Sequence, residues 1–217
     1  MKILYIYAHQ EPKSFNAALK ETAFSVLGNE GHNVKISDLY AMKFKAVLDS
    51  EDFLNRKNPE IFKPFLEAMH ASKTETFAPD IKTEMDKVKW AELLIFQFPV
   101  YFSSMPAIMK GWLDRVLAPG FAFNPITKSA YEKGLLKGKA AMLVLSTGAS
   151  EEWYSKGGAH GALLELLKPI THCVFEYTGM KVLPSYVSFE VGAQSREKGA
   201  KELERYRQSL LKLEEWF

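Results

Sequence analysis

Tyr154 and His160 lie six residues apart in a glycine-bearing stretch that covers residues 145–161. A phenol and an imidazole supply two hydrogen-bond donors that can move a proton near neutral pH. The glycines of this stretch would let backbone amides approach a ligand closely. A flexible surface loop with a solvated tyrosine would have the same spacing, so the spacing alone leaves both interpretations open.

A second candidate segment lies between Pro99 and Pro106. An apolar run ends at Pro99, because proline has no N–H to donate to a central strand, and Pro106 suits a first helical turn. Tyr101 and Phe102 lie between the two prolines. Aromatic pairs are more often core residues, but a pair at the carboxyl end of a strand could also stack on a flat ligand.

The third candidate segment precedes a predicted helix that begins at Phe15. Ser14 can cap that helix, and the free N–H groups of the first turn then form an anion site that suits a phosphate. In the simpler interpretation, Ser14 is only a cap and His9 only a polar loop residue, and this loop alone favours that interpretation. The segment has neither the GxGxxG nor the GxxxxGK[ST] pattern.

The three candidate segments follow predicted strands, and the strands alternate with helices along the chain. Strand-like patterns cover residues 2–8, 33–37, 92–98, 139–146 and 180–187, and helical patterns cover 15–27, 80–91, 161–178 and 195–215. Such alternation predicts an α/β fold in which helices cover both faces of a parallel sheet. Ligands bind at the carboxyl ends of the strands in such sheets.

Residues 39–76 interrupt this rhythm, because they contain two short aromatic helical patches and no obvious strand. A segment of this length needs its own packing or the surface of a partner. Its apolar face around Phe62, Phe65 and Met69 predicts an interface with a second copy of the chain.

Composition predicts one folded domain over residues 1–217, since 47% of the residues are hydrophobic and 25% are charged. A net charge of only +2 argues against a nucleic-acid partner or an anionic membrane surface. Cys173 is the only cysteine, which excludes an intrachain disulfide and a multi-cysteine metal site, and its neighbours Val174 and Phe175 favour a buried thiol. No apolar run is long enough to span a membrane, so we expect a soluble, cytoplasmic protein without a metal.

Several motifs, in a fixed order, resemble those of the NAD(P)H quinone dehydrogenase (DT-diaphorase-like) family of flavoproteins. The motifs are AHQEPKSFNAALK, SDLYAMKF, FAPDI, LIFQFPV followed by MPAIMKGWLDRV, and STGAS followed by Y-x5-HG. The resemblance implies a flavodoxin-like, doubly wound, five-stranded parallel sheet in the order 2-1-3-4-5, with a long irregular segment after strand 2. It also implies a homodimer, bound FAD with FMN as the alternative, and two-electron transfer from NAD(P)H to quinones.

The resemblance further implies which residues contact the flavin. Tyr154 and His160 match the pair that handles the charge on the reduced flavin, and Tyr154 also contacts the cofactor. The other cofactor-binding residues fall in the three candidate segments: His9, Ser14, Phe15 and Asn16; Pro99, Val100, Tyr101, Phe102 and Ser103; and Ser146, Thr147, Gly148 and Ala149.

At one point the chain departs from the family, because Phe102 and Ser103 replace a bulky Trp-Phe pair. The smaller Ser103 should open the pocket for the acceptor. An azo or nitro reductase is one alternative function, and a flavin-bound regulatory subunit of a membrane transporter is another. The balanced charge and the Tyr154/His160 pair favour the quinone reductase.

Overall fold

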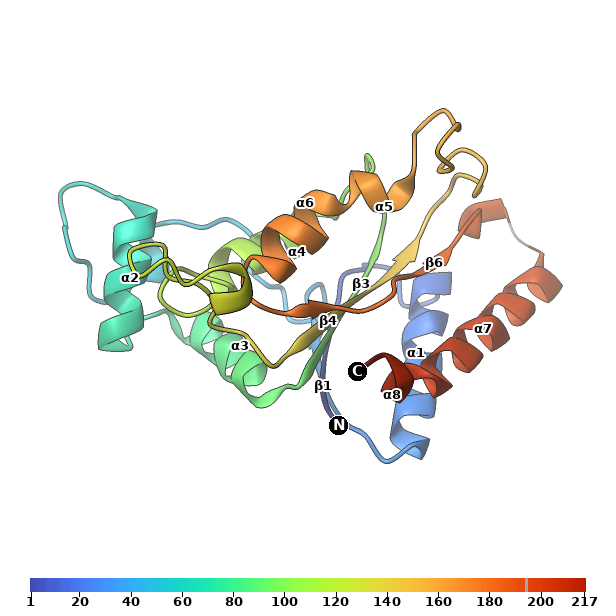
Figure 1. Ribbon diagram of the computed structural model, residues 1–217, viewed down its shortest axis with the longest axis horizontal. Helices are drawn as coiled ribbons and strands as arrows, with labels where there is room; N and C mark the ends of the chain where they lie inside the picture. Colours follow the sequence, from blue (N-terminus) through green and yellow to red (C-terminus); the bar gives the residue numbers. More distant parts are fainter. Residues whose placement is uncertain (194) are drawn as a thin grey trace.

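The computed structural model describes residues 1–193 and 195–217 (Figure 1). Its strands are β1 (Lys2–Tyr7), β2 (Asn33–Asp38), β3 (Leu93–Pro99), β4 (Ala140–Ser146), β5 (Lys181–Val182) and β6 (Tyr186–Ser188). The pairings between these strands are parallel, in the order β2-β1-β3-β4-β5, and β6 also pairs with β4. The predicted flavodoxin-like order is confirmed.

Helices cover both faces of the sheet because both faces of its strands are apolar. In β1, Leu4 and Ile6 belong to one hydrophobic core, and Tyr5 and Tyr7 belong to the other. α1 and α7 pack side by side on the Tyr5 face, whereas α3 and α4 cover the opposite face (Figure 1). The longer helices are α1 (Phe15–Asn29), α2 (Pro64–Thr74), α3 (Pro79–Trp90), α4 (Ala107–Val116) and α7 (Arg196–Leu211).

The remaining helical segments are short. They are η1 (Ser50–Asp52), η2 (Tyr131–Lys133), α5 (Leu163–Leu166), α6 (Lys168–Ile170), the π-helix η3 (Thr171–Glu176), η4 (Val191–Ala193) and α8 (Leu213–Trp216). None of the helices in the described part of the chain has the length and apolar character that a membrane span requires.

The predicted fifth strand is wrong in one respect, because the structure divides it into β5 and β6. Leu183 still donates its N–H to the Ala141 carbonyl oxygen at 2.9 Å. Pro184 comes next and has no N–H to donate, so the ladder is interrupted until β6 begins.

Other local differences follow from tertiary contacts. β3 extends one residue beyond the predicted end at residue 98, because Pro99 pairs with Ser146 and is the last residue of the strand. Asp80 does not cap α3, which begins at Pro79; its carboxylate binds Arg115 instead. Cys173 is exposed rather than buried, because the π-helix turns Phe175 into the core and leaves the thiol outside.

The long segment after β2 packs largely against its own chain. The Phe53 ring contacts Phe62 and Phe77, with ring centroids 6.0 and 5.8 Å away. Met69 is buried and Phe62 is partly buried, so they form no exposed patch, contrary to the sequence prediction. Phe65 is 39% exposed.

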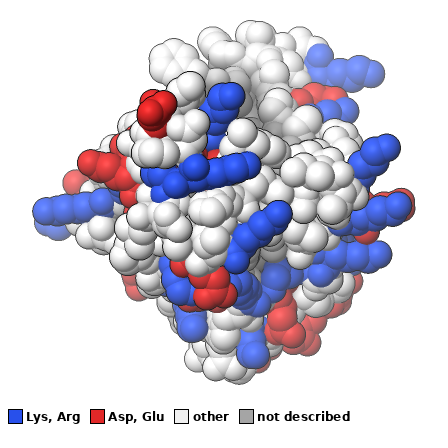
Figure 2. All heavy atoms as spheres, turned by 90° about the vertical axis from the view of Figure 1, so that its left-hand side faces the viewer, with Lys and Arg blue, Asp and Glu red and all other residues white. Residues whose placement is uncertain are grey.

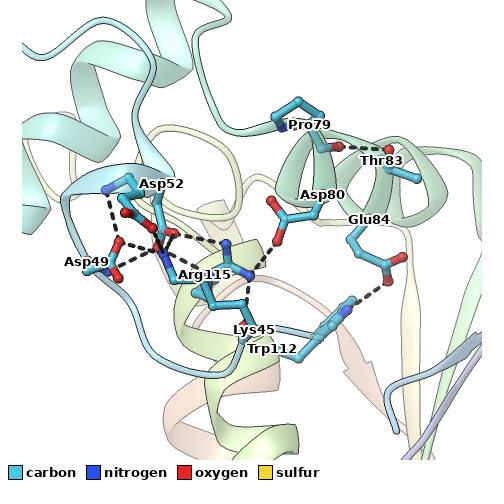
Figure 3. Close-up of polar contacts among 10 residues, drawn as sticks. Lys45, Asp49, Asp52, Pro79, Asp80, Thr83, Glu84, Trp112 and Arg115 are labelled. Atoms are coloured by element: carbon cyan, nitrogen blue, oxygen red, sulfur yellow. Dashed lines mark hydrogen bonds and ion pairs between the residues drawn. The ribbon is translucent and has the colours of Figure 1, made fainter. Parts of the chain in front are cut away.

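A buried ion pair fixes this segment to the two helices beside it (Figure 3). Arg115 of α4 donates to both carboxylate oxygens of Asp52, from Nη2 at 2.9 Å and from Nε at 3.1 Å. Its Nη1 donates to Asp80 of α3 at 2.7 Å and to the Lys45 carbonyl oxygen at 2.8 Å. The Arg115 and Asp52 side chains are each 1% exposed, so protein groups must replace water around both charges; Lys45 Nζ, 3.2 Å from Asp52 Oδ1, contributes to this on the Asp52 side.

We therefore expect Arg115→Met to lower the free energy of unfolding by about 3 kcal/mol, because it removes both Arg115 donors from the buried Asp52 carboxylate and leaves it with the weaker contact from Lys45 Nζ at 3.2 Å. Lys110→Met on the same helix removes an exposed pair with Asp114 and should cost about 1 kcal/mol or less. Urea unfolding measures both changes. Equal losses would show that the buried pair does not anchor the segment.

Candidate functional site

Three loops meet at the carboxyl edge of the sheet: the β1 loop (residues 8–14), the β3 loop (residues 100–106) and the β4 loop (residues 147–162). Hydrogen bonds connect them. Asn16, at the start of α1, places its Nδ2 2.9 Å from Ser146 Oγ, and the Val100 N–H donates to the Ser146 carbonyl oxygen at 2.8 Å. The structure thus brings the three predicted groups of residues together.

The β1 loop offers an anion site at the start of α1. Ser14 Oγ accepts from the Ala17 N–H at 3.1 Å, which confirms the predicted cap. The N–H groups of Phe15 and Asn16 have no acceptor within the described residues, so both remain available to a ligand. His9 Nδ1 accepts from the Glu11 N–H at 3.1 Å and orders the loop.

The β3 loop contains a strained turn with an aromatic tip. Tyr101 and Ser104 exchange two backbone hydrogen bonds of 2.9 Å, as in a type I′ turn. The central residues Phe102 and Ser103 have φ values of 48° and 57°, which L-residues adopt at a cost. The Phe102 side chain is fully exposed, so the turn presents an aromatic ring at the carboxyl edge of the sheet.

The β4 loop exposes its backbone near the buried end of the strand. Thr147 donates its N–H to the Ser188 carbonyl oxygen at 2.9 Å, and its Oγ1 donates to the Ala149 carbonyl oxygen at 2.6 Å. A Cβ built on Gly148 would meet nothing within 4 Å, which shows open space beside the backbone. The N–H groups of Gly148 and Ala149 have no acceptor in the described part of the chain.

Farther along the β4 loop, the structure pairs Tyr154 with His160. Their ring centroids lie 4.9 Å apart, and the His160 N–H donates to the Trp153 carbonyl oxygen at 2.9 Å. The Trp153 ring contacts the imidazole from 5.1 Å, a contact that the sequence analysis missed. Gly158 makes this compact loop possible, because a Cβ there would lie 2.1 Å from the Glu152 carbonyl oxygen.

Sequence reasoning also missed a hollow of about 510 Å³ between the starts of α1 and α7. Lys13 and Ser14 line one side, and Arg196 and Leu203 line the other. A serine before a helix, as at Ser195, is a visible sequence signal. The side-by-side packing of α1 and α7 is not visible in the sequence.

Comparisons with known proteins identify the family of the chain. A model of the flavodoxin-like fold matches residues 1–210. The chain belongs to this family. A ribosyldihydronicotinamide dehydrogenase [quinone] from Homo sapiens is 44% identical over 201 residues, which cover 91% of this chain and 86% of that protein.

Two further proteins are similar to this chain. An NAD(P)H dehydrogenase [quinone] 1 from Cavia porcellus is 41% identical over 192 residues, or 88% of this chain and 69% of that protein. A solved structure from Klebsiella pneumoniae, assigned as a quinone reductase, has a TM-score of 0.93 at 40% identity and covers 98% of this chain and 85% of that one. The family resemblance identified from the motifs is confirmed.

The strain at Ser103 gives a direct prediction for this flavodoxin-like protein. Ser103→Gly should raise the free energy of unfolding by about 1 kcal/mol, since relief of the left-handed backbone exceeds the entropic cost of glycine. Ser104→Gly, at a neighbouring residue without a positive φ, should instead lower it. Urea unfolding compares the two variants, and changes of the same sign would contradict the strain.

Proposed function

We propose that this protein is a flavin-dependent NAD(P)H:quinone oxidoreductase. The observation that carries the proposal is the convergence of three loops that present unpartnered backbone N–H groups and an exposed aromatic ring at one edge of the sheet. A relative from Homo sapiens that is named a quinone dehydrogenase is 44% identical to this chain over 201 residues. A bound flavin would accept hydride from reduced nicotinamide and deliver it to the acceptor.

The donors of the three loops fit the parts of a flavin. The N–H groups of Phe15 and Asn16 suit a phosphate, because they lie at a helix N-terminus. The β3 and β4 loops suit the ring: Phe102 offers an aromatic face, and the N–H groups of Gly148 and Ala149 can bind ring oxygens. Tyr7, just before the β1 loop, stays protonated, because burial raises its pKa to about 12.

Tyr154 and His160 are the candidates for catalysis. Donors that are already oriented toward developing negative charge lower a barrier, because they need not reorganise during the reaction. The Tyr154 hydroxyl would provide such a donor, and His160, against its ring, would hold or relay the proton.

Tyr154→Phe and His160→Gln should therefore slow the reduction of bound flavin by NADH or NADPH. We expect each substitution to raise the activation free energy of this step by about 2–4 kcal/mol at most. Flavin binding should stay within twofold of the parent, because the loop backbones remain. Stopped-flow absorbance measures the reduction rate. Rates within twofold of the parent in both variants would assign the pair to loop structure.

The hollow beside Ser14 supports FAD rather than FMN. Two cationic side chains, Lys13 and Arg196, line a volume next to the anion site, where the second phosphate and the adenosine of FAD could lie. FMN lacks these groups and would leave the hollow unused.

Arg196→Met should thus weaken FAD binding about tenfold and FMN binding less than twofold, since only FAD reaches the hollow. Lys201→Met on the same helix removes an exposed ion pair with Glu197 and should change neither. Titration of the apoprotein, followed by flavin fluorescence, gives the constants. A parent protein that binds no flavin would end the proposed function, and equal losses for FAD and FMN would exclude this role for the hollow.

A homodimer is also proposed, on the outer surface of the long segment. Val47, Leu54 and Ile61 are 70%, 67% and 55% exposed there. Figure 2 shows the side of the molecule that carries α2, with charges of both signs scattered among broad uncharged areas. Large apolar side chains that stay exposed on one segment of a folded protein favour an interface. The proposed location is cytoplasmic, where the exposed Cys173 thiol would stay reduced.

Sedimentation should show a dimer at micromolar concentration with flavin bound. The double variant Leu54→Glu and Ile61→Glu should dissociate it, because it would place two carboxylates in the apolar contact. Leu135→Glu, which alters an exposed leucine outside the segment, should leave the dimer intact. A monomeric parent would contradict the proposal.

A further inference from the structure

A continuous buried hydrogen-bond chain runs from the C-terminal helix α7 to the candidate site. Tyr206 of α7 places its hydroxyl 3.2 Å from that of Tyr5, and Tyr5 donates to Gln97 Oε1 at 2.6 Å. Gln97 Nε2 donates to the Asn16 carbonyl oxygen at 2.7 Å, and the Asn16 side chain binds Ser146 Oγ. The chain therefore joins α7 to two residues that border the β1 and β4 loops, and its Tyr5–Tyr206 contact spans 201 residues of sequence.

The Asn16 carbonyl oxygen fixes the direction of the donors from Gln97 outward to Tyr206. The Asn16 carbonyl oxygen can only accept, so the Gln97 amide must direct its Nε2 toward it. Gln97 Oε1 then faces Tyr5, whose single hydroxyl proton is used in that bond. Tyr206 must therefore be the donor to Tyr5.

Burial isolates the chain from water. Tyr5, Gln97 and Tyr206 are fully buried, and Asn16 and Ser146 are each 3% exposed. Burial also raises the pKa values of Tyr5 and Tyr206 well above the normal value for tyrosine, so both hydroxyls keep their protons. Loss of the Tyr5 hydroxyl removes the donor to Gln97 Oε1, and loss of the Tyr206 hydroxyl removes the donor to the Tyr5 oxygen. The group that loses its donor is buried, so it can find a new partner only if it moves.

We propose that Tyr206 and Tyr5 are positioning residues of the cofactor site: they hold the Gln97 amide and, through it, Asn16 and Ser146 in the arrangement that binds flavin. Ser146 extends the effect to the third loop, because its carbonyl oxygen accepts from the Val100 N–H. Docking of α7 and flavin affinity are then coupled through a fixed set of hydrogen bonds. This inference rests on the proposed flavin function.

Tyr186 provides a matched control. Its hydroxyl also contacts α7, donating to Glu202 Oε1 at 2.8 Å, and its ring centroid lies 4.5 Å from that of Tyr206. It is not a member of the chain. Tyr186→Phe therefore removes a hydroxyl contact with α7 without breaking the connection to Asn16.

The experiment titrates the apoprotein forms of Tyr5→Phe, Tyr206→Phe, the double variant and Tyr186→Phe with FAD. Visible circular dichroism of the bound flavin is recorded in parallel. Tyr5→Phe and Tyr206→Phe should raise the dissociation constant by about threefold to tenfold and change the flavin spectrum. The double variant should be no weaker than Tyr5→Phe, because the chain is already broken there. Tyr186→Phe should stay within twofold of the parent.

The outcomes separate this inference from the proposed function. If the parent binds no flavin, the proposed function fails. If the parent binds flavin but Tyr206→Phe matches Tyr186→Phe, or the two chain variants add in the double variant, only the positioning role fails. Thermal melts identify any variant that does not fold, and in that case Tyr206→Phe, at the outer end of the chain, decides the result alone.

Discussion

The parallel pairing of β1, β3 and β4 is the constraint on which the rest of the structure depends. Because all three strands run in the same direction, the loops that follow them must emerge at one edge of the sheet. Residues separated by 130 positions, Asn16 and Ser146, can then share a hydrogen bond. The fold thus supplies the rigid frame, and the loops supply the donors and the aromatic ring.

Buried polar groups on both faces of the sheet hold the helices, the long segment and the loops in place. On one face of the sheet, the Arg115–Asp52 pair fixes the long segment to the helices. On the other face, the chain from Tyr206 to Asn16 connects α7 with the loops. Desolvation offsets much of the attraction within such groups, but the loss of one partner is costly because it leaves the other partner buried without its contact.

The sequence predicted the parts that depend on local patterns. Alternation and helical period located four of the strands and the start of α1, and the motifs identified the family. The split of the fifth strand was not predicted, although Pro184 within it was a visible signal of an interruption. Periodicity could not predict the exposure of Cys173, since a π-helix shifts the period by one residue in each turn.

Contacts between segments that are distant in the chain could not be predicted from the sequence. The hollow between α1 and α7 and the bond between Tyr5 and Tyr206 leave no local pattern, because each arises only when the C-terminal helix docks. The sequence also gives no sign that Trp153 contacts His160, because the two rings meet only in the folded loop.

The most direct test of the central claim is an anaerobic two-step mixing experiment on the purified protein. The protein is mixed first with a reduced nicotinamide, which is NADH, NADPH or ribosyldihydronicotinamide. One equivalent of a benzoquinone is then added. The account predicts that the visible flavin absorbance bleaches in the first step and returns in the second with formation of the hydroquinone. Absorbance that fails to bleach with all three donors, or that bleaches and does not return with the quinone, would contradict it.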